Sequence, residues 1–289
     1  MTDNKPLLTV KNLNITFPSP KGDVHAVKNV GFSLGKEKVG IVGESGSGKS
    51  VTGRSVLRLL PPYAKISADE ISFRGKNLLA YSEKEMRQIR GNEISMVMQD
   101  PKYSLNPVRT VGEQISEAYI VHSKVSKAVA RDQTLKMLAA VRIRNPEQVY
   151  RLYPHQVSGG MGQRIMIAMM LIPDPSLLIA DEPTSALDVT VQLQVLAILD
   201  DLVSQRGMGL IFISHDLELV ASFCDRIIIM YGGRIMEIID ADELYKSTHP
   251  YTQGLLNCLP RIGGKKHRLA TLKRDESWLD ADFSVSAVR

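Results

Sequence analysis

The chain has few cysteines, and its apolar residues do not gather into long runs. Only two of its 289 residues are cysteine, Cys224 and Cys258, and their spacing matches neither a disulfide framework nor a zinc site. The most apolar stretch, Ile165–Ile172, is far shorter than the roughly 18–20 residues of a membrane-spanning helix. The polar start, MTDNKPLL, also lacks the apolar core of a secretory signal. We therefore expect a cytoplasmic chain without disulfides, zinc or a membrane span.

The chain also has no basic stripe interleaved with aromatic residues, although its net charge is +5. Its basic residues are dispersed except in the tail around Arg261–Arg274. Nucleic acid is therefore not an expected partner. The tail is either a solvated segment or a contact for a partner subunit or anionic lipid headgroups.

The most informative stretch is rich in glycine. Residues 43–50 read GESGSGKS, the phosphate-binding loop pattern, and the apolar residues Val39–Val42 before them predict a buried strand. Glycines let successive N–H groups and the start of the next helix point at phosphate oxygens. The lysine supplies a charge to the outer phosphates, and the final hydroxyl can ligate magnesium. We expect a bound nucleoside triphosphate contacted by Gly43, Glu44, Ser45, Gly46, Ser47, Gly48, Lys49, Ser50 and Val51.

A second glycine turn opens a predicted helix, Met161–Met170. Residues 157–164 read VSGGMGQR, and Ser158 is placed to cap the helix. Two anion-binding helix starts fit one nucleotide if each phosphate loop faces the serine-glycine turn of a partner chain. Here the sequence resembles the ATP-binding cassette family. The resemblance implies nucleotide contacts from Ser158, Gly159, Gly160 and Met161, although Met161 stands where the family usually has glutamine.

Two carboxylates follow another predicted buried strand, Leu177–Ala180. Ligands bind beyond the carboxyl ends of parallel strands, so Asp181 and Glu182 should meet the nucleotide. The family resemblance implies that Asp181 holds magnesium and that Glu182 orients or deprotonates the attacking water.

Four further residues match the family's pattern. His215 follows the apolar strand Leu210–Ser214, and the resemblance implies that it contacts the terminal phosphate. By the same resemblance, Gln99 senses magnesium and the membrane partner, and Asp188 belongs to the SALD loop along the dimer seam. Phe17 either stacks on the adenine or packs in the core.

Hydrophobic periodicity and the resemblance together predict an α/β fold with a P-loop NTPase core of ABC type. We expect the core in residues 1–99 and 158–240, with an N-terminal β-rich part over Leu7–Phe73, a helical subdomain at 100–157 and a short C-terminal extension at 241–289. Predicted helices cover Lys49–Leu60, ended by two prolines, and Val111–His122 and Ser126–Val141.

Two stretches, QDPKYSLNPVRTVG at 99–112 and THPYTQGL at 248–255, resemble the ATPases of dipeptide, oligopeptide and nickel importers. The resemblance implies an ATP-hydrolysing importer subunit for peptides at the inner face of the plasma membrane. Its cofactors would be ATP and Mg²⁺, the metal held by Ser50, Gln99 and Asp181, with catalysis by Glu182, His215 and Lys49.

The expected partners are a second cassette ATPase, two transmembrane permease subunits and an extracytoplasmic solute-binding protein. A heterodimer of cassettes is favoured, although the sequence leaves a homodimer open. Nickel, opines or another small solute remain alternatives to peptide. An exporter or a non-transport ATPase of the family also remains open, but no heptad coiled coil of the length that DNA-repair members carry lies between Ser50 and Ser158.

Overall fold

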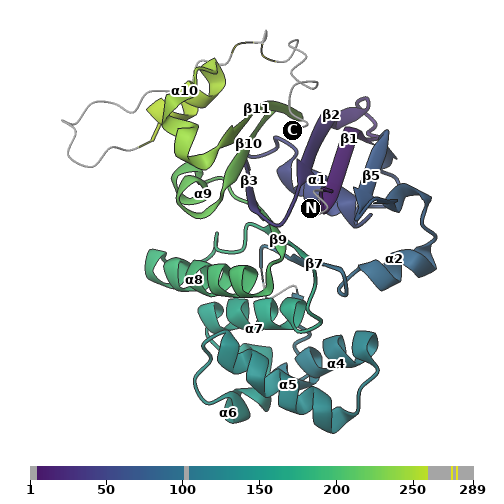
Figure 1. Cartoon of the computed structure of the whole chain (residues 1–289), viewed down its shortest axis with the longest axis vertical. Helices are drawn as coiled ribbons and strands as arrows, with labels where there is room; N and C mark the ends of the chain where they lie inside the picture. Colours follow the sequence, from purple (N-terminus) through teal and green to yellow (C-terminus); the bar gives the residue numbers. More distant parts are fainter. Residues whose placement is uncertain (1–4, 101–103, 260–274, 276–277, 279–289) are drawn as a thin grey trace, which may run out of the picture. The chain divides into compact units, whose positions relative to one another are not determined.

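The computed structural model of the chain describes residues 5–100, 104–259, 275 and 278 (Figure 1). The described residues form two units, one drawn from residues 1–80 and 212–289 and the other from 81–211. We call them the first and second unit. The basic stretch Arg261–Arg274 lies outside the described residues. The three-part division into core, helical subdomain and extension stays a prediction.

An antiparallel sheet occupies the first part of the chain, as predicted. Its strands are β1 (Leu8–Phe17), β2 (Val24–Leu34), β4 (Lys65–Ser67), β5 (Glu70–Phe73) and β6 (Lys76–Asn77). The long strand β1 is central, because it pairs with β2, β4 and β5. Side chains alternate between the two faces of a strand, so Leu13 and Ile15 are both buried. Val10 is buried on the other side of a register shift between Val10 and Leu13, which interrupts the alternation.

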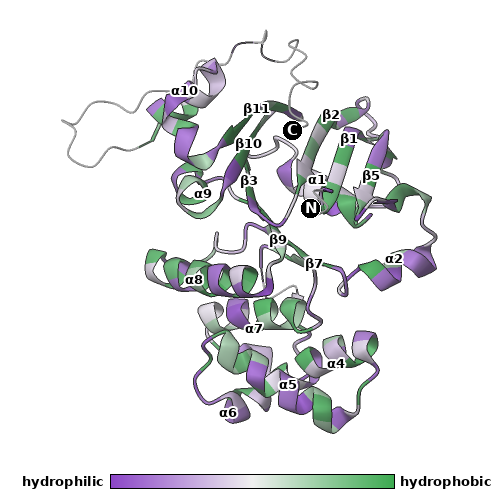
Figure 2. Cartoon of the chain, in the orientation of Figure 1, coloured by the Kyte–Doolittle hydropathy of each residue, from purple (hydrophilic) through white to green (hydrophobic). Residues whose placement is uncertain are grey.

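A second group of strands in the first unit contains two strands, at 38–43 and 226–231, that are buried almost throughout. Strand β3 (Lys38–Gly43) runs parallel to β10 (Arg226–Tyr231), which pairs antiparallel with β11 (Arg234–Asp240). Figure 2 shows β3 and β10 mainly hydrophobic along their length, whereas β1 and β2 alternate. Continuous apolar runs are typical of parallel strands covered on both faces. The predicted strand Val39–Val42 is thus confirmed within β3.

Helix α1 follows the phosphate loop but covers only Lys49–Val56, so the predicted end at Leu60 is wrong. Arg58 adopts a left-handed conformation with φ of 53°. The Arg58 amide donates to Ser55 O, and the Leu59 amide donates to Arg54 O, both at 3.0 Å. These bonds form a Schellman motif, which satisfies the last carbonyl groups of the helix. The motif therefore ends α1 before the two prolines are reached.

The second unit contains the helices predicted at 111–122, 126–141 and 161–170, together with helices that were not predicted. They are α2 (Glu83–Ile89), α4 (Val111–Ser123), α5 (Lys127–Ala140), α6 (Pro146–Tyr150), α7 (Gly159–Leu171) and α8 (Val189–Arg206). Thr110 and Glu113 form a capping box at the start of α4, where the bonds from the Thr110 backbone and side chain hold the pKa of Glu113 below its ordinary value. Ser126 caps α5. The helices predicted at 111–122 and 126–141 are confirmed.

A parallel strand pair supports these helices. Strand β7 (Ile94–Val97) pairs with β8 (Leu177–Asp181), and both are fully buried. Strand β9 (Gly209–Ile213) begins in the same unit, where the Gly209 amide donates to Ser176 O at 2.9 Å. The carboxyl ends of β7 and β8 are followed by Gln99 and Glu182, so both residues lie at one edge of this sheet.

The first unit closes with α9 (Leu217–Phe223) and α10 (Pro250–Asn257). Short 3-10 turns lie at Leu78–Ala80, Pro154–Gln156 and Ala241–Lys246. Across residues 5–100 and 104–259, no helix combines the length and the apolar character that a membrane crossing requires.

Candidate functional site

The phosphate loop adopts a conformation that requires its glycines. Gly43, Gly46 and Gly48 have φ values of 155°, 81° and 98°. A Cβ at Gly43 would lie 2.1 Å from Met230 O, and one at Gly48 would lie 2.6 Å from Ala26 O. Both neighbouring atoms are backbone atoms and cannot move aside cheaply. The loop is therefore accessible only to glycine at these two positions.

Lys49 is buried, with 6% of its surface exposed, and its ammonium turns back over the loop. Nζ donates to Gly43 O at 2.8 Å and to Glu44 O at 2.9 Å. Helix α1 begins at Lys49, and its cap residue is Gly48, which has no side chain to occupy the helix start. A positive charge and the start of a helix thus converge on the loop, the arrangement that binds an anion.

Ser47 adds a further group suited to a phosphate. It is 3% exposed, and within the described part of the chain its buried hydroxyl has no hydrogen-bond partner. Buried hydroxyl groups normally have a partner, so this group has a donor to offer to a ligand. The orphaned hydroxyl, the glycine cradle and the Lys49 ammonium fit a triphosphate.

The turn between β10 and β11 supports the loop from one side. The Gly233 amide donates to Ser47 O at 3.2 Å, and the Lys28 amide donates to Gly233 O at 2.8 Å. Gly233 has a φ of 85°, which suits this tight turn.

His215 lies where the sequence predicted, just past the end of β9. The Ser214 amide donates to Ile41 O in β3 at 3.1 Å. Ile41 is two residues before the phosphate loop. The exposed His215 therefore lies at the same edge of the first unit as the loop.

Phe17 is half-buried at the end of β1. Its ring meets that of Tyr63, with the ring centroids 6.3 Å apart. Phe17 is therefore not enclosed in the core, the alternative that the sequence had left open.

In the second unit, the two acidic residues have different environments. Asp181 is 2% exposed at the end of β8, whereas Glu182 is half-buried. Glu182 has a φ of 49°, a conformation that costs a residue other than glycine about 1–3 kcal/mol. Such strained positions cluster at functional sites.

A hydrogen-bond network holds Glu182 in place. Gln99 Nε2 donates to Glu182 Oε2 at 3.1 Å and to Ser185 Oγ at 3.3 Å. Ser185 Oγ in turn donates to Glu182 O at 3.2 Å. Gln99 and Glu182, two of the predicted site residues, are therefore in direct contact.

The serine-glycine turn and the loop before α8 both cap helices. Ser158 Oγ accepts from the Met161 amide at 3.3 Å, and Asp188 Oδ1 accepts from the Val191 amide at 3.0 Å. A Cβ at Gly160 would lie 2.6 Å from Val191 Cγ1. The starts of α7 and α8 therefore lie against each other, which brings the Ser158 turn close to Asp188.

A model of the ABC transporter family matches residues 27–185, more than half of the chain. This chain belongs to the ABC transporter family. A second model, the oligopeptide/dipeptide transporter C-terminal region, matches residues 236–282.

Relatives of known name share about half of their residues with this ABC transporter chain. The dipeptide transport ATP-binding protein DppD of Bacillus subtilis is 50% identical over 259 residues, which cover 89% of this chain and 77% of the relative. The oligopeptide transport ATP-binding protein OppD of Escherichia coli is 46% identical over 268 residues, which cover 92% and 79%.

A solved structure confirms the predicted cassette fold. It is a dimeric, post-hydrolysis state of the ATP-binding cassette MJ0796 bound to ADP and Pi. It superposes with a TM-score of 0.73 at 26% identity, covering 81% of this chain and 98% of that chain.

Some features near these residues were missed by the sequence reasoning. Ser185 was noted only as part of the SALD loop, and nothing in its spacing indicated the contact with Gln99. Tyr63 carried no signal, because its contact with Phe17 depends on the turn after α1. Helix α2 was also missed, although the sequence does carry a signal for it: Ser82 and Glu85 have the spacing of a capping box.

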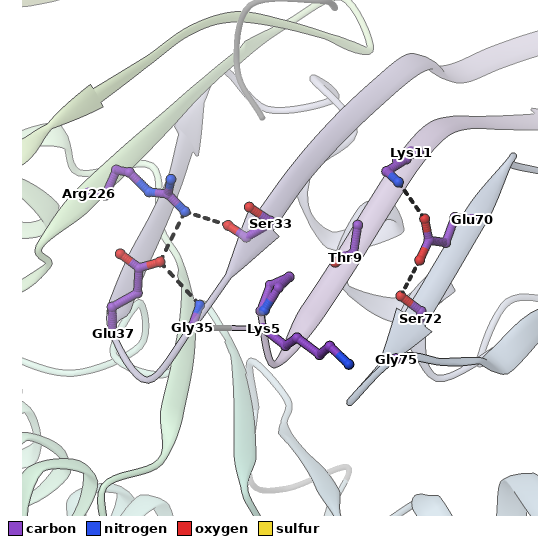
Figure 3. A pocket seen from close by; sticks show the side chains of 11 residues that line it. Lys5, Thr9, Lys11, Ser33, Gly35, Glu37, Glu70, Ser72, Gly75 and Arg226 are labelled. Carbon is purple, nitrogen blue, oxygen red and sulfur yellow. Dashed lines mark hydrogen bonds and ion pairs between the residues drawn. The ribbon is translucent and has the colours of Figure 1, made fainter. Parts of the chain in front are cut away.

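A polar pocket of about 520 Å³ lies on the antiparallel sheet (Figure 3). No residue of the phosphate loop lines it. Lys11 lies 2.7 Å from Glu70, whose pKa is lowered by this bond and by one from Ser72. Arg226 likewise pairs with Glu37 at 3.1 Å. Lys11 and Arg226 are thus already paired with carboxylates of the same pocket. We therefore do not take this pocket as the candidate site for a triphosphate.

Proposed function

We propose that the chain is the ATP-hydrolysing subunit of an ABC importer that takes up peptides. The observation that carries the proposal is the match of residues 236–282 to the oligopeptide/dipeptide transporter C-terminal region. It is supported by relatives named as dipeptide and oligopeptide transport ATP-binding proteins. An ATPase role is supported by the cassette motifs and by the structural likeness to a cassette that holds ADP and Pi.

The phosphate loop binds the triphosphate in this proposal. Its amides and the start of α1 receive the phosphate oxygens, and Lys49 leaves its two backbone carbonyl partners to contact the outer phosphates. Glu44, Ser45, Gly46 and Val51 complete the contacts of the loop.

Magnesium, where bound, would supply positive charge that neutralises the phosphate oxygens. Hard oxygen donors suit this ion, and Ser50, Gln99 and Asp181 carry such oxygens. Among the residues that the structure describes, no cluster of three or more His, Cys, Asp or Glu could hold a metal by itself. We propose that Ser50, Gln99 and Asp181 would hold the ion together with the nucleotide.

Glu182 is the proposed base that orients and deprotonates the attacking water, and His215 contacts the terminal phosphate. The strained backbone and the Gln99 hydrogen bond support a functional role for Glu182. Gln99 is well placed to couple a membrane partner to this carboxylate. Its side chain contacts Glu182, and the residues after it belong to the stretch that resembles importer ATPases.

Two cassettes act together in the proposed mechanism. The turn of Ser158, Gly159, Gly160 and Met161 closes over the nucleotide of a partner cassette, and Asp188 lies along the seam. ATP favours the closed pair only through interactions that the open pair lacks, which are those of this turn. A different cassette chain is the proposed partner, with two permease subunits and an extracytoplasmic binding protein. The chain would then be peripheral at the cytoplasmic face of the membrane.

A mild-detergent purification of the tagged chain from native membranes tests the assignment. We expect mass spectrometry to identify two multi-span membrane proteins and a second cassette ATPase. Reconstituted with the binding protein, the complex should hydrolyse ATP faster when a short peptide is added, and Glu182→Gln should retain bound ATP. Recovery of the chain without membrane proteins would contradict the transport role. If nickel stimulates ATP hydrolysis and peptides do not, the transported solute is nickel and not a peptide.

A further inference from the structure

Two aromatic rings make an edge-to-face contact at the end of β1. The rings of Phe17 and Tyr63 have centroids 6.3 Å apart and planes inclined by 65°. Tyr63 is 63% exposed, although a tyrosine ring gains most of its stabilising energy from burial. An open corner of two rings, one half-buried and one exposed, offers two apolar walls to a flat ligand.

The position of Tyr63 is fixed by structure on both sides of it. The Ala64 amide donates to Pro61 O at 2.9 Å, which closes a β-turn with Pro62 and Tyr63 at its centre. The next residue, Lys65, pairs with Thr16 across β4 and β1, and its ammonium lies 3.5 Å from Asp23. The turn and the strand pairing therefore hold the Tyr63 ring beside Phe17.

The ring pair is also close to the phosphate loop. Ile15 pairs with Val27, and Val27 Cγ2 lies 3.3 Å from the place of a Cβ at Gly48. Phe17 is two residues farther along β1, about 7 Å away along the strand. This spacing suits a ligand whose phosphates occupy the loop and whose other end reaches the rings.

We propose that Tyr63 is a nucleobase-binding residue and forms an aromatic corner with Phe17. The base stacks on Phe17 and turns an edge toward Tyr63, so both rings contact it at favourable angles. This contact uses the ring faces and edges, so the phenol hydroxyl of Tyr63 is not required for it. The inference rests on the proposed function, in which the loop binds ATP and Phe17 receives the adenine.

Comparing two ligands on the full-length chain tests the corner. Dissociation constants are measured for MgATP and for magnesium with inorganic triphosphate, which has phosphates but no base. Tyr63→Ala should weaken ATP binding about two- to tenfold, the strength of one aromatic contact, and leave inorganic triphosphate unchanged. Tyr63→Phe should restore ATP binding. Tyr245→Ala is the matched control, because Tyr245 is 68% exposed elsewhere in the first unit and should change neither constant.

Two further variants separate this inference from the proposed function. If Phe17→Ala weakens ATP selectively but Tyr63→Ala does not, the base site stands without Tyr63 and the inference fails. Equal weakening of both ligands by Tyr63→Ala would indicate a structural role and also overturns it. If Lys49→Ala binds both ligands normally, the phosphate loop is not the site and the proposed function itself fails.

Discussion

The side-chain amide of Gln99 donates a hydrogen bond to the carboxylate of Glu182, with Nε2 3.1 Å from Oε2, although 83 residues separate them in sequence. The same amide reaches Ser185, whose hydroxyl donates to the backbone of Glu182. Any movement of Gln99 therefore acts on the carboxylate that we propose as the catalytic base. The left-handed backbone of Glu182 makes its position depend on these supporting bonds.

Replacing Gln99 tests this support. Gln99→Ala should slow ATP hydrolysis by about tenfold or more, since a hydrogen bond to a charged group contributes about 1.5–3 kcal/mol. The dissociation constant for ATP should change little, because the phosphate loop is intact. Gln148→Ala, at an exposed position on α6, is the matched control. A Gln99→Ala complex with the turnover of the unmodified one would remove Gln99 from the mechanism.

Variants of Ser158 separate helix capping from cassette closure. Ser158→Arg removes the bond to the Met161 amide and should lower the free energy of unfolding by about 1 kcal/mol. Ser158→Asp keeps a capping oxygen but adds a negative charge facing phosphate. Both variants should abolish ATP turnover in the assembled complex while ATP still binds, but only the arginine variant should lose stability. Normal turnover in the aspartate variant would rule out contact between this turn and a partner's nucleotide.

The phosphate loop should not tolerate a side chain at Gly43. Gly43→Ala places a Cβ 2.1 Å from Met230 O, and the required φ of 155° adds strain. We expect a loss of about 1–3 kcal/mol of stability together with weaker ATP binding. Gly35→Ala is the control, because a Cβ there meets nothing within 4 Å. Thermal unfolding curves of the two variants should separate clearly, and coincident curves would contradict the loop geometry.

His249 makes stability depend on pH. Its Nδ1 accepts from the Tyr251 amide at 3.2 Å at the start of α10, which requires the neutral ring. Burial lowers the pKa of His249 below its ordinary value of 6.5. The unfolded chain therefore takes up this proton more readily, so the contribution is complete above about pH 6.5 and is lost as the pH falls through the folded-state pKa.

Denaturant unfolding between pH 5.5 and 8 measures the effect of this histidine. His249→Asn keeps a capping acceptor but cannot titrate, so its stability should fall less steeply at low pH than that of the unmodified chain. His122, whose pKa burial also lowers, is present in both chains and cancels in the comparison. Parallel curves would show that His249 does not contribute.

The two thiols should differ in reactivity. Cys224 is 6% exposed and burial raises its pKa, whereas Cys258 is partly exposed at the end of α10. Thiol reagents attack the thiolate, so at pH 8 one thiol of the folded chain should react quickly and the second only after unfolding. Cys258→Ser should abolish the fast reaction. Fast modification of that variant would mean that Cys224 is accessible.

Much of the fold could be predicted from the sequence because its signals are local. The helix that follows Ser126 and the buried strand before Gly43 are set by capping and by apolar runs within a few residues. The end of α1 was mistaken because prolines are a visible stop signal, whereas a left-handed arginine at position 58 is not. A Schellman motif most often has glycine at this position, so an arginine there gave no sign that the helix ends.

The sequence by itself determined the phosphate loop, the capped start of α7 and the pair Asp181 and Glu182, since each motif depends on the backbone preferences of adjacent residues. Only the tertiary structure decided which side chains meet. The Gln99 bond to Glu182 requires β7 and β8 to be neighbours, and the meeting of Phe17 with Tyr63 requires β4 to pair with β1. Such contacts depend on how segments distant in sequence pack together, and patterns of adjacent residues do not specify that packing.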